Sequence, residues 1–248
     1  SSSDGMQILY GSAMGKVGPV EVEVIDCNLD KQTLIHTNWY HADCLCNYYN
    51  VEAMSDEFWR INRNYIKTAV EHGINCILTP VFTPPLDTKV GGERRTVQLV
   101  DVKVHGKTYS FNFANLQKWI DMCLECGVEY FEISHFYTQW GAKHAPKIVA
   151  LDRKGREKKI FGWLTRTSSK AYDDFLTQFA AAFTKVVESE GIKDKCFLHV
   201  SDEPNEKQLE TYAKRAKLIA EIFPGFKVID ALSEFKEIDI NKIGCMGN

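Results

Sequence analysis

The chain has 248 residues, of which 44% are hydrophobic and 25% are charged; this composition is typical of a globular protein with a sizeable core. Its formal net charge of -3 at pH 7 provides no large positive field, so we expect no nucleic-acid partner. The sequence has neither an apolar run of about 18 residues nor a charged and then apolar signal peptide at its start, so we expect a soluble chain without a membrane span.

Residues 1–32 are predicted to form an N-terminal extension, separate from the remainder. Residues 1–5 lack an initiator Met and resemble a processed or artificially added start. A signal removed earlier would make the chain secreted or periplasmic, and the sequence leaves the compartment open. Residues 20–27 alternate between apolar and polar side chains, which indicates a remnant of a preceding β domain or an added edge strand.

Residues 33–248 repeat a short apolar run followed by an amphipathic helix, the pattern of βα units and of a parallel sheet. The expected strands are residues 33–38, 74–79, 128–134, 196–201 and 227–232, with a sixth near 240–246. The first expected helix is capped by Ser55. The other expected helices contain Leu116 to Cys123, start near Ser168 or Ser169, and start at Pro204. The sequence therefore predicts an α/β fold, a parallel βα barrel of the TIM type that is incomplete, with about five to six units instead of the full set. The unpaired edges of such a sheet favour a homo-oligomer that covers them.

Two of the segments that follow predicted strands are long, residues 80–112 and 135–167. Each contains a predicted β-hairpin, with turn signals at residues 105–107 and 153–155. In a βα barrel such segments lie at the C-terminal ends of the strands, where active sites are built. We therefore expect the functional site on the face that these two segments enlarge.

The sequence carries no metal or cofactor motif. The eight cysteines include Cys123 and Cys126 at helical spacing, which is typical of packed thiols, and no pair of histidines completes a zinc set. There is no HExxH, no GxGxxG after a strand and no P-loop, and the GxSxG elbow of a serine hydrolase is also missing. We expect no metal and no cofactor.

Residues 197–204, FLHVSDEP, place the adjacent acids Asp202 and Glu203 where a buried strand gives way to a helix. Two carboxylates in different environments can act as proton donor and electrostatic partner, as glycosidic cleavage requires. Adjacent side chains point to opposite sides of an extended backbone, so they are poorly placed as acid and nucleophile around one bond. A sugar that supplies its own 2-acetamido oxygen as nucleophile removes this difficulty, with Asp202 orienting the amide and Glu203 protonating the leaving oxygen. The alternative is that both acids cap the helix expected at Pro204.

The string SDEP at residues 201–204, together with HTNWYH at residues 36–41 and TPVFTPP at residues 79–85, resembles glycoside hydrolase family 123, the exo-acting β-N-acetylgalactosaminidases. The resemblance covers nearly all of the chain after its N-terminal extension. It implies a TIM-type barrel preceded by a β-sandwich domain, no metal, and retaining, substrate-assisted hydrolysis by Asp202 and Glu203. The implied partner is a carbohydrate, a β-linked N-acetylgalactosaminide of a glycan or glycolipid.

Polar and aromatic side chains near the predicted rim are candidates for binding the sugar, because loops at strand ends form substrate walls and aromatic rings stack on sugars. The candidates are His36, Trp39, His41, His135, Tyr137, Trp140, His144 and Trp163. For the first three, a satisfied polar network is an equally good explanation. Trp163 is equally suited to anchoring the second hairpin.

Two alternatives to this enzyme stay open. The first is a non-catalytic or assembly-dependent carbohydrate-binding barrel fragment, which a sheet with unpaired edges favours. The second keeps catalysis but pairs carboxylates from different strands on a sugar without the acetamido group, with Asp87, Glu132 or Glu234 as the partner. The sequence does not decide between galacto and gluco configurations, because these epimers differ in the orientation of one hydroxyl.

Overall fold

The computed structural model describes residues 7–9, 20–22, 33–139, 141–152 and 154–231. The chain divides into two units, Ser1–Leu34 and Ile35–Asn248. In the first unit, β1 (Gln7–Leu9) and β2 (Val20–Val22) pair as antiparallel strands. The rest of the strand expected at residues 20–27 and the sixth strand expected near 240–246 lie outside the described residues, and the division into 1–32 and 33–248 stays a prediction.

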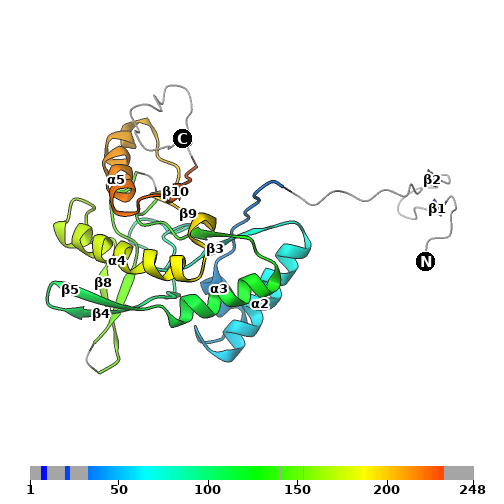
Figure 1. Cartoon of the computed structure of the whole chain (residues 1–248), viewed down its shortest axis with the longest axis horizontal. Coiled ribbons are helices and arrows are strands. Elements are labelled where there is room, and N and C mark those ends of the chain that lie inside the picture. Colours follow the sequence, from blue (N-terminus) through cyan, green and yellow to red (C-terminus); the bar gives the residue numbers. More distant parts are fainter. Residues whose placement is uncertain (1–6, 10–19, 23–32, 140, 153, 232–248) are drawn as a thin grey trace. The chain divides into compact units, whose positions relative to one another are not determined.

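The second unit is built on a parallel sheet (Figure 1). Its order is β10 (Lys227–Val228), β9 (Cys196–Leu198), β6 (Tyr130–Ile133) and β3 (Cys76–Thr79). The parallel pairing of these strands confirms the predicted α/β fold. Within the described residues the sheet does not close into a barrel, and the TIM type of the predicted incomplete barrel stays a prediction. One detail differs from the prediction: the segment 33–38 adds only a single bridge, between Thr37 and Cys76, in place of the expected strand.

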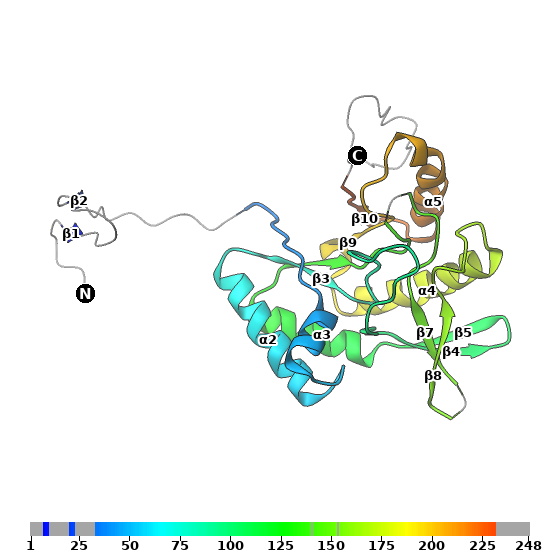
Figure 2. The ribbon, with the colours of Figure 1, turned by 180° about the vertical axis from the view of Figure 1, so that it is seen from behind.

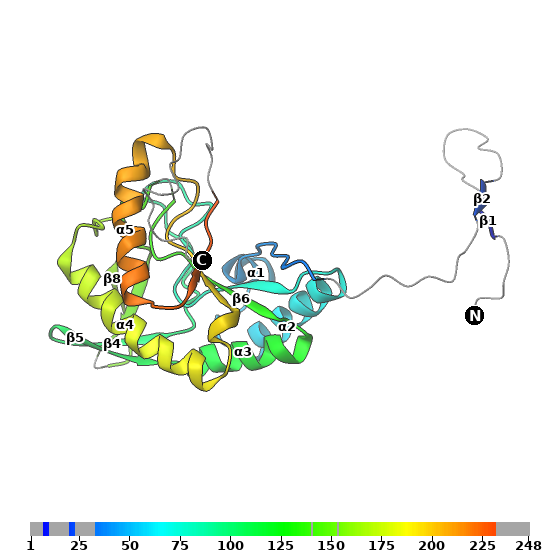
Figure 3. The same cartoon turned by 45° about the horizontal axis from the view of Figure 1, so that its top comes forward.

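The described part of this unit contains five α-helices. They are α1 (Ala42–Tyr49), α2 (Asp56–Glu71), α3 (Ala114–Cys126), α4 (Lys170–Ser189) and α5 (Leu209–Ile222). Helices α2 and α3 pack against each other, as do α4 and α5 (Figure 3). The predicted cap of α2 is confirmed, because the Ser55 side chain accepts a hydrogen bond of 3.2 Å from Phe58 N. Among the described residues, no helix combines the length and the apolar character that a membrane span requires.

The helix expected to start at Pro204 starts only at Leu209. The reason is a 3₁₀ turn over residues 206–208, which comes first. The backbone N–H of Asn205 donates to the side-chain oxygen of Gln208 at 3.0 Å and stabilises this turn. A second difference is α1, which the sequence pattern does not predict, because its buried face is short and is shared between small and polar residues.

The two long segments form a second sheet (Figure 2). One hairpin consists of β4 (Asp101–His105) and β5 (Thr108–Asn112), and the other of β7 (Ile148–Leu151) and β8 (Glu157–Phe161). Both predicted hairpins are therefore confirmed. The sheet order β5-β4-β7-β8, with Lys103 paired in parallel to Leu151, is a feature that the sequence pattern does not predict.

A buried aromatic cluster fixes the second sheet and the long segments to α4. The ring of Phe175 in α4 lies 5.7 Å from Phe111 of β5 and 5.0 Å from Phe161 of β8. One turn further, Phe179 lies 4.7 Å from Phe82, which follows β3. Fully burying a side chain of this size contributes roughly 1.5–3 kcal/mol. The cluster thereby packs both long segments against α4.

Candidate active site

Asp202 lies beyond β9, at the C-terminal edge of the parallel sheet where the sequence places it. Pairing with the neighbouring segment continues past the strand, because Tyr137 N donates to Val200 O at 3.1 Å. The Asp202 side chain is buried, and Gln139 Nε2 donates a hydrogen bond of 2.9 Å to its carboxylate. A neighbour from the adjacent strand end thus holds the carboxylate in one orientation.

Glu203 differs from Asp202 in both exposure and backbone conformation. It is exposed, and its φ of 45° lies in the left-handed region, which costs a non-glycine residue roughly 1–2 kcal/mol. Strain of this kind is characteristic of functional sites. Neither acid caps α5, which begins at Leu209 with Gln208 as its N-cap. The capping alternative is therefore wrong.

The strain at Glu203 can be measured by comparing two substitutions that both remove the carboxylate. Glu203→Gly relieves the left-handed backbone, whereas Glu203→Ala keeps it. We expect the free energy of unfolding of the glycine variant to be up to about 1 kcal/mol higher than that of the alanine variant. The greater flexibility of glycine in the unfolded chain reduces this difference. Urea denaturation of the two proteins measures the difference. An alanine variant that is as stable as the glycine variant would show that the backbone at this position is unstrained.

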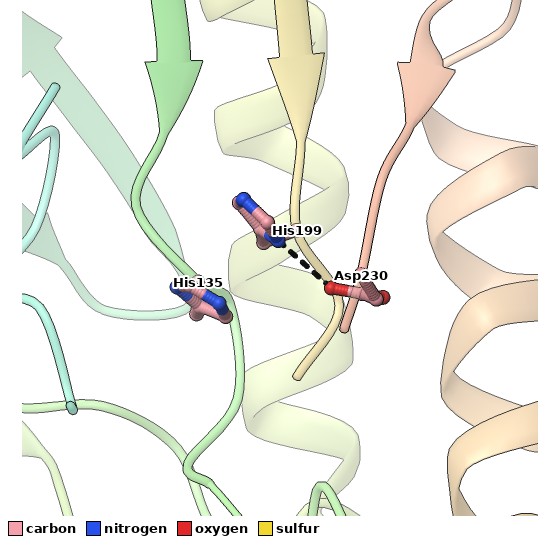
Figure 4. A group of neighbouring side chains, drawn as sticks. All are labelled: His135, His199 and Asp230. Atoms are coloured by element: carbon pink, nitrogen blue, oxygen red, sulfur yellow. Dashed lines mark hydrogen bonds and ion pairs between the residues drawn. The ribbon is translucent and has the colours of Figure 1, made fainter. Parts of the chain in front are cut away.

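Three buried ionisable side chains, Glu132, His199 and Asp230, form a row across neighbouring strands of the sheet, and Figure 4 shows two of them, His199 and Asp230. Glu132 of β6 is hydrogen-bonded through Oε1 to His199 Nε2. On its other side, His199 Nδ1 is 2.9 Å from Asp230 Oδ1, beyond β10. The side chains of His199 and Asp230 are only 4% and 3% exposed. We call these residues the Glu132–His199–Asp230 row.

Both carboxylates of the row have further hydrogen-bond donors. Glu132 accepts from the Thr37 hydroxyl and, at 2.8 Å, from Trp39 Nε1. Asp230 accepts from the Tyr212 hydroxyl at 2.6 Å and from Val200 N at 3.2 Å. The lone pairs of two buried acids are thereby satisfied, which is the condition for keeping charge in an interior.

The row favours a protonated His199. Burial alone would lower the pKa of His199, but its hydrogen bonds to Asp230 and Glu132 outweigh burial and raise the pKa to about 9. Burial also acts to raise the pKa of Glu132, and here the hydrogen bond from His199 prevails and the pKa is lowered. For Asp230, burial outweighs the hydrogen bond with His199, and the pKa of Asp230 is raised. At neutral pH the row therefore holds an imidazolium between two acids.

A raised histidine pKa makes stability depend on pH. The unfolded His199 titrates near pH 6.5 and the folded one near 9, so its contribution is complete below about pH 6.5 and is lost as the pH rises through 9. We expect the free energy of unfolding to fall over this interval, by on the order of 3 kcal/mol at most. Urea titrations at pH 6, 7, 8 and 9 measure the slope, and His199→Gln should flatten it. A wild-type curve that is level from pH 6 to 9 would contradict a buried imidazolium.

His135 is a sequence-predicted candidate whose ring packs directly on the row. It follows β6, is buried, and stacks on His199 with 4.0 Å between ring centroids and 16° between ring planes. Trp39 packs edge-on against the His135 ring, with 5.4 Å between ring centroids. Two of the sequence-predicted candidates, Trp39 and His135, are thus brought together at the rim.

Three of these residues present the donor set of a divalent metal. One ligand atom each of His135, His199 and Asp230 lies within 4.8 Å of the others (Figure 4), and two imidazoles with a carboxylate suit a transition metal. In the present geometry both nitrogens of His199 are hydrogen-bonded to carboxylates. A metal would have to take the place of the proton between His199 and Asp230.

The segment after Trp39 fixes the first long segment through two polar contacts. His41 Nε2 is 3.0 Å from a carboxylate oxygen of Asp87, which is itself 72% exposed. Arg94 Nε donates a hydrogen bond of 2.9 Å to the buried carboxylate of Asp43. These bonds favour the explanation that His41 belongs to a satisfied polar network over the explanation that it binds the sugar.

Trp163 and His144 lie together at the second long segment. Their ring centroids are 5.6 Å apart, and Trp163 Nε1 donates to Gly92 O at 2.7 Å, joining the two segments. Trp163 also lines a narrow hollow with Thr83, Thr138 and others. The hollow has a volume of about 20 Å³, which is room for a water molecule and not for a sugar ring.

Three other sequence-predicted candidates take different places. His36 is exposed, and its carbonyl accepts from Asn75 N and Cys76 N at the start of β3, away from the C-terminal edge. Tyr137 is fully buried and packs edge-on against Tyr172 at 5.7 Å, so it lies in the core and not in the expected pocket wall. Trp140 lies outside the described residues.

Several buried polar atoms near the strand ends make no hydrogen bond within the described part of the chain. They are Thr83 Oγ1, Thr138 Oγ1, Gln139 Oε1 and His41 Nδ1. Buried polar groups without a partner are rare, and each one calls for an explanation. Thr83 and Thr138 also line the narrow hollow beside Trp163, where a water molecule has room to supply a partner.

The sequence motifs assign no role to His199 or Asp230 and indicate Glu132 only as an alternative catalytic acid. A signal is present, because Glu132 and His199 are polar residues within the apolar runs YFEI and FLHV. A charged group inside a buried parallel strand requires a partner. In the structure Glu132 is committed to Thr37, Trp39 and His199, which disfavours a separate role as nucleophile. Glu234 lies outside the described residues.

Comparisons with known proteins indicate a family and a similar fold. Residues 39–245 match the family model of the glycoside hydrolase 123 catalytic domain. The solved structure of a family 123 glycoside hydrolase from Clostridium perfringens, described in connection with glycolipid glycan hydrolysis, has a TM-score of 0.61 over 82% of this chain, at 15% sequence identity. The matched region is 36% of that protein, so the present chain spans about a third of its length. The comparison with curated proteins gives no match.

Proposed function

Since this chain belongs to glycoside hydrolase family 123, whose members are glycosidases, we propose that it is a retaining exo-β-N-acetylgalactosaminidase that uses the 2-acetamido group of its substrate as nucleophile. The fold that supports this activity is proposed to be the open part of a TIM-type barrel, with the site at the C-terminal edge of its parallel strands. No metal or cofactor takes part in the proposed reaction.

In the first step, the acetamido oxygen attacks the anomeric carbon as the glycosidic bond breaks. Asp202 holds and polarises the acetamido N–H, while the Glu203 carboxyl transfers its proton to the leaving oxygen. The product is a bicyclic oxazolinium ion and a released alcohol. In the second step, Glu203 takes a proton from water, whose oxygen attacks the anomeric carbon from the side that the leaving group left. The bond between the anomeric carbon and the acetamido oxygen breaks at the same time, which restores the acetamido group. Two inversions give net retention.

The observation that carries this proposal is the contrast between the two adjacent acids. Asp202 is buried and fixed by Gln139, as a group that orients an amide must be. Glu203 is exposed on a left-handed backbone, as suits a group that exchanges protons with a leaving oxygen and then with water. The family membership supports the same assignment. The similarity to the Clostridium perfringens enzyme, which is connected with glycolipid glycan hydrolysis, supports a glycolipid glycan as one form of the substrate.

Hydrolysis of p-nitrophenyl 2-acetamido-2-deoxy-β-D-galactoside tests the proposal, with the gluco epimer measured alongside. We expect release of p-nitrophenol and, by NMR, a sugar product that is first formed as the β-anomer. Turnover of the gluco epimer alone would move the specificity to N-acetylglucosamine. Initial formation of the α-anomer would exclude the retaining mechanism, and folded protein without turnover on either sugar would contradict the activity.

A further inference from the structure

The imidazole of His135 is held rigidly although it takes no part in the proposed proton transfers. It is 1% exposed, one face lies 4.0 Å from the His199 ring, and Trp39 packs edge-on against it at 5.4 Å. Trp39 and His199 are in turn tied to the same atom, Glu132 Oε1. The orientation of the His135 ring is therefore set by its two neighbours, which Glu132 connects.

The two nitrogens of this ring have no hydrogen-bond partner within the described part of the chain. A buried imidazole left in that state has lost its contacts with water without replacement, which is costly. Burial first, and then the charges of His199 and His41, hold the pKa of His135 well below its ordinary range. The ring is therefore neutral and offers one N–H donor and one acceptor nitrogen. A hydroxyl group, which both donates and accepts, suits either atom.

The location of His135 connects it to the proposed catalytic acids. It follows β6, and the same segment continues to Gln139, which binds Asp202 at 2.9 Å. The next segment, beyond β9, pairs with it through Phe136 N and His199 O at 3.3 Å. His135 and Asp202 therefore belong to neighbouring strand ends on one edge of the sheet. A sugar whose acetamido group is held by Asp202 has its remaining ring hydroxyls within the same region.

We propose that His135 binds a ring hydroxyl of the sugar and that the Glu132–His199–Asp230 row, with Trp39, positions its imidazole for this contact. The inference rests on the proposed function, because the hydroxyl belongs to the sugar whose bond Glu203 cleaves. Access requires a small movement. His41, whose charge also acts on His135, is held by a bond to the exposed Asp87 and is the side chain that we expect to move.

The test combines one substitution in the protein with the removal of single hydroxyls from the ligand. Both proteins carry Glu203→Gln, so that no ligand is hydrolysed. Titration calorimetry measures Kd for the methyl 2-acetamido-2-deoxy-β-D-galactoside and for its 3-deoxy, 4-deoxy and 6-deoxy analogues, with and without His135→Phe. We expect His135→Phe to raise Kd for the parent sugar about tenfold, as the loss of a hydrogen bond does. For one deoxy analogue the two proteins should bind equally.

Matched variants separate binding from folding. His135→Gln keeps a donor and an acceptor and should recover part of the affinity, and thermal melts establish that each variant is folded. His105→Phe, at the exposed tip of the β4–β5 hairpin, should leave every Kd unchanged. If His135 had only a structural role, His135→Phe would raise Kd for the parent sugar and for all three analogues by the same factor.

Three results would overturn the inference. These are equal losses for all four ligands, no binding of any ligand by folded protein, and zinc binding that needs His135 while sugar affinity does not. The assay also separates the inference from the proposed function. Hydrolysis by the wild-type chain together with equal losses would remove the role of His135 and leave the activity. If His135→Phe weakened the parent sugar but not one deoxy analogue, and the wild-type chain hydrolysed no sugar, the proposed activity would be wrong and His135 would still bind a sugar hydroxyl.

Discussion

Glu203→Gln should lower kcat/KM for an alkyl β-N-acetylgalactosaminide by a factor of about 10²–10⁴, the usual contribution of a general acid. The amide keeps the size of the carboxyl group but cannot protonate the leaving oxygen. The loss should be smaller for the p-nitrophenyl glycoside, because p-nitrophenolate leaves without a proton. Steady-state kinetics with the two substrates measure both effects.

Glu206 provides a matched control for Glu203. It is an exposed acid in the adjacent 3₁₀ turn, and Glu206→Gln should leave both rates unchanged. If Glu203→Gln kept more than about a tenth of the wild-type rate on the alkyl glycoside, its role as the acid would be contradicted. Equal losses on the two glycosides would also count against proton transfer to the leaving group.

Glu132→Ala should lower the free energy of unfolding at pH 7 by about 3–5 kcal/mol, the range for breaking a buried ion pair by removing one partner. The substitution leaves the His199 imidazolium with one acid and removes the acceptor of Thr37 and Trp39. Urea denaturation monitored by tryptophan fluorescence measures this loss. Glu132→Gln, which retains an acceptor oxygen, should lose less.

An exposed ion pair in the same unit gives the comparison. Glu52, whose side chain is 89% exposed, lies 2.9 Å from Arg95. Because solvent screens such pairs, Glu52→Ala should change the free energy of unfolding little or not at all. If Glu132→Ala lowered the free energy of unfolding as little as Glu52→Ala, the row would carry no buried charge. This result would contradict its proposed role in positioning His135.

Local sequence patterns predict the elements that depend on local interactions. The stripe of Phe58, Ile61 and Ile66 predicts α2, and Ser55 predicts its start, because helical periodicity and capping act over a few residues. The parallel pairing of Lys103 with Leu151 joins segments far apart in sequence, and no local pattern encodes it. The segment 33–38 has the composition of a strand, but only Thr37 is paired, because strand formation depends on neighbours that the sequence does not specify.

The candidate site divides in the same way. Asp202 and Glu203 are predicted because they are adjacent and follow an apolar strand, and both features are visible in the sequence. The Glu132–His199–Asp230 row is not predicted, because its bonds join residues 67 and 31 positions apart. The exposure of His36 and the burial of Tyr137 likewise depend on the direction of each side chain from its strand. Residue type alone does not determine that direction.

The most direct measurement of the substrate-assisted mechanism is the rate of hydrolysis as fluorine replaces hydrogen in the substrate's acetamido methyl group. Each fluorine withdraws electrons from the carbonyl oxygen and weakens it as a nucleophile, while the rest of the sugar is unchanged. We expect kcat/KM to fall steeply from the acetamido through the monofluoro and difluoro to the trifluoro substrate. A flat series would show that the acetamido oxygen does not attack the anomeric carbon, and would contradict the role of Asp202 in orienting it.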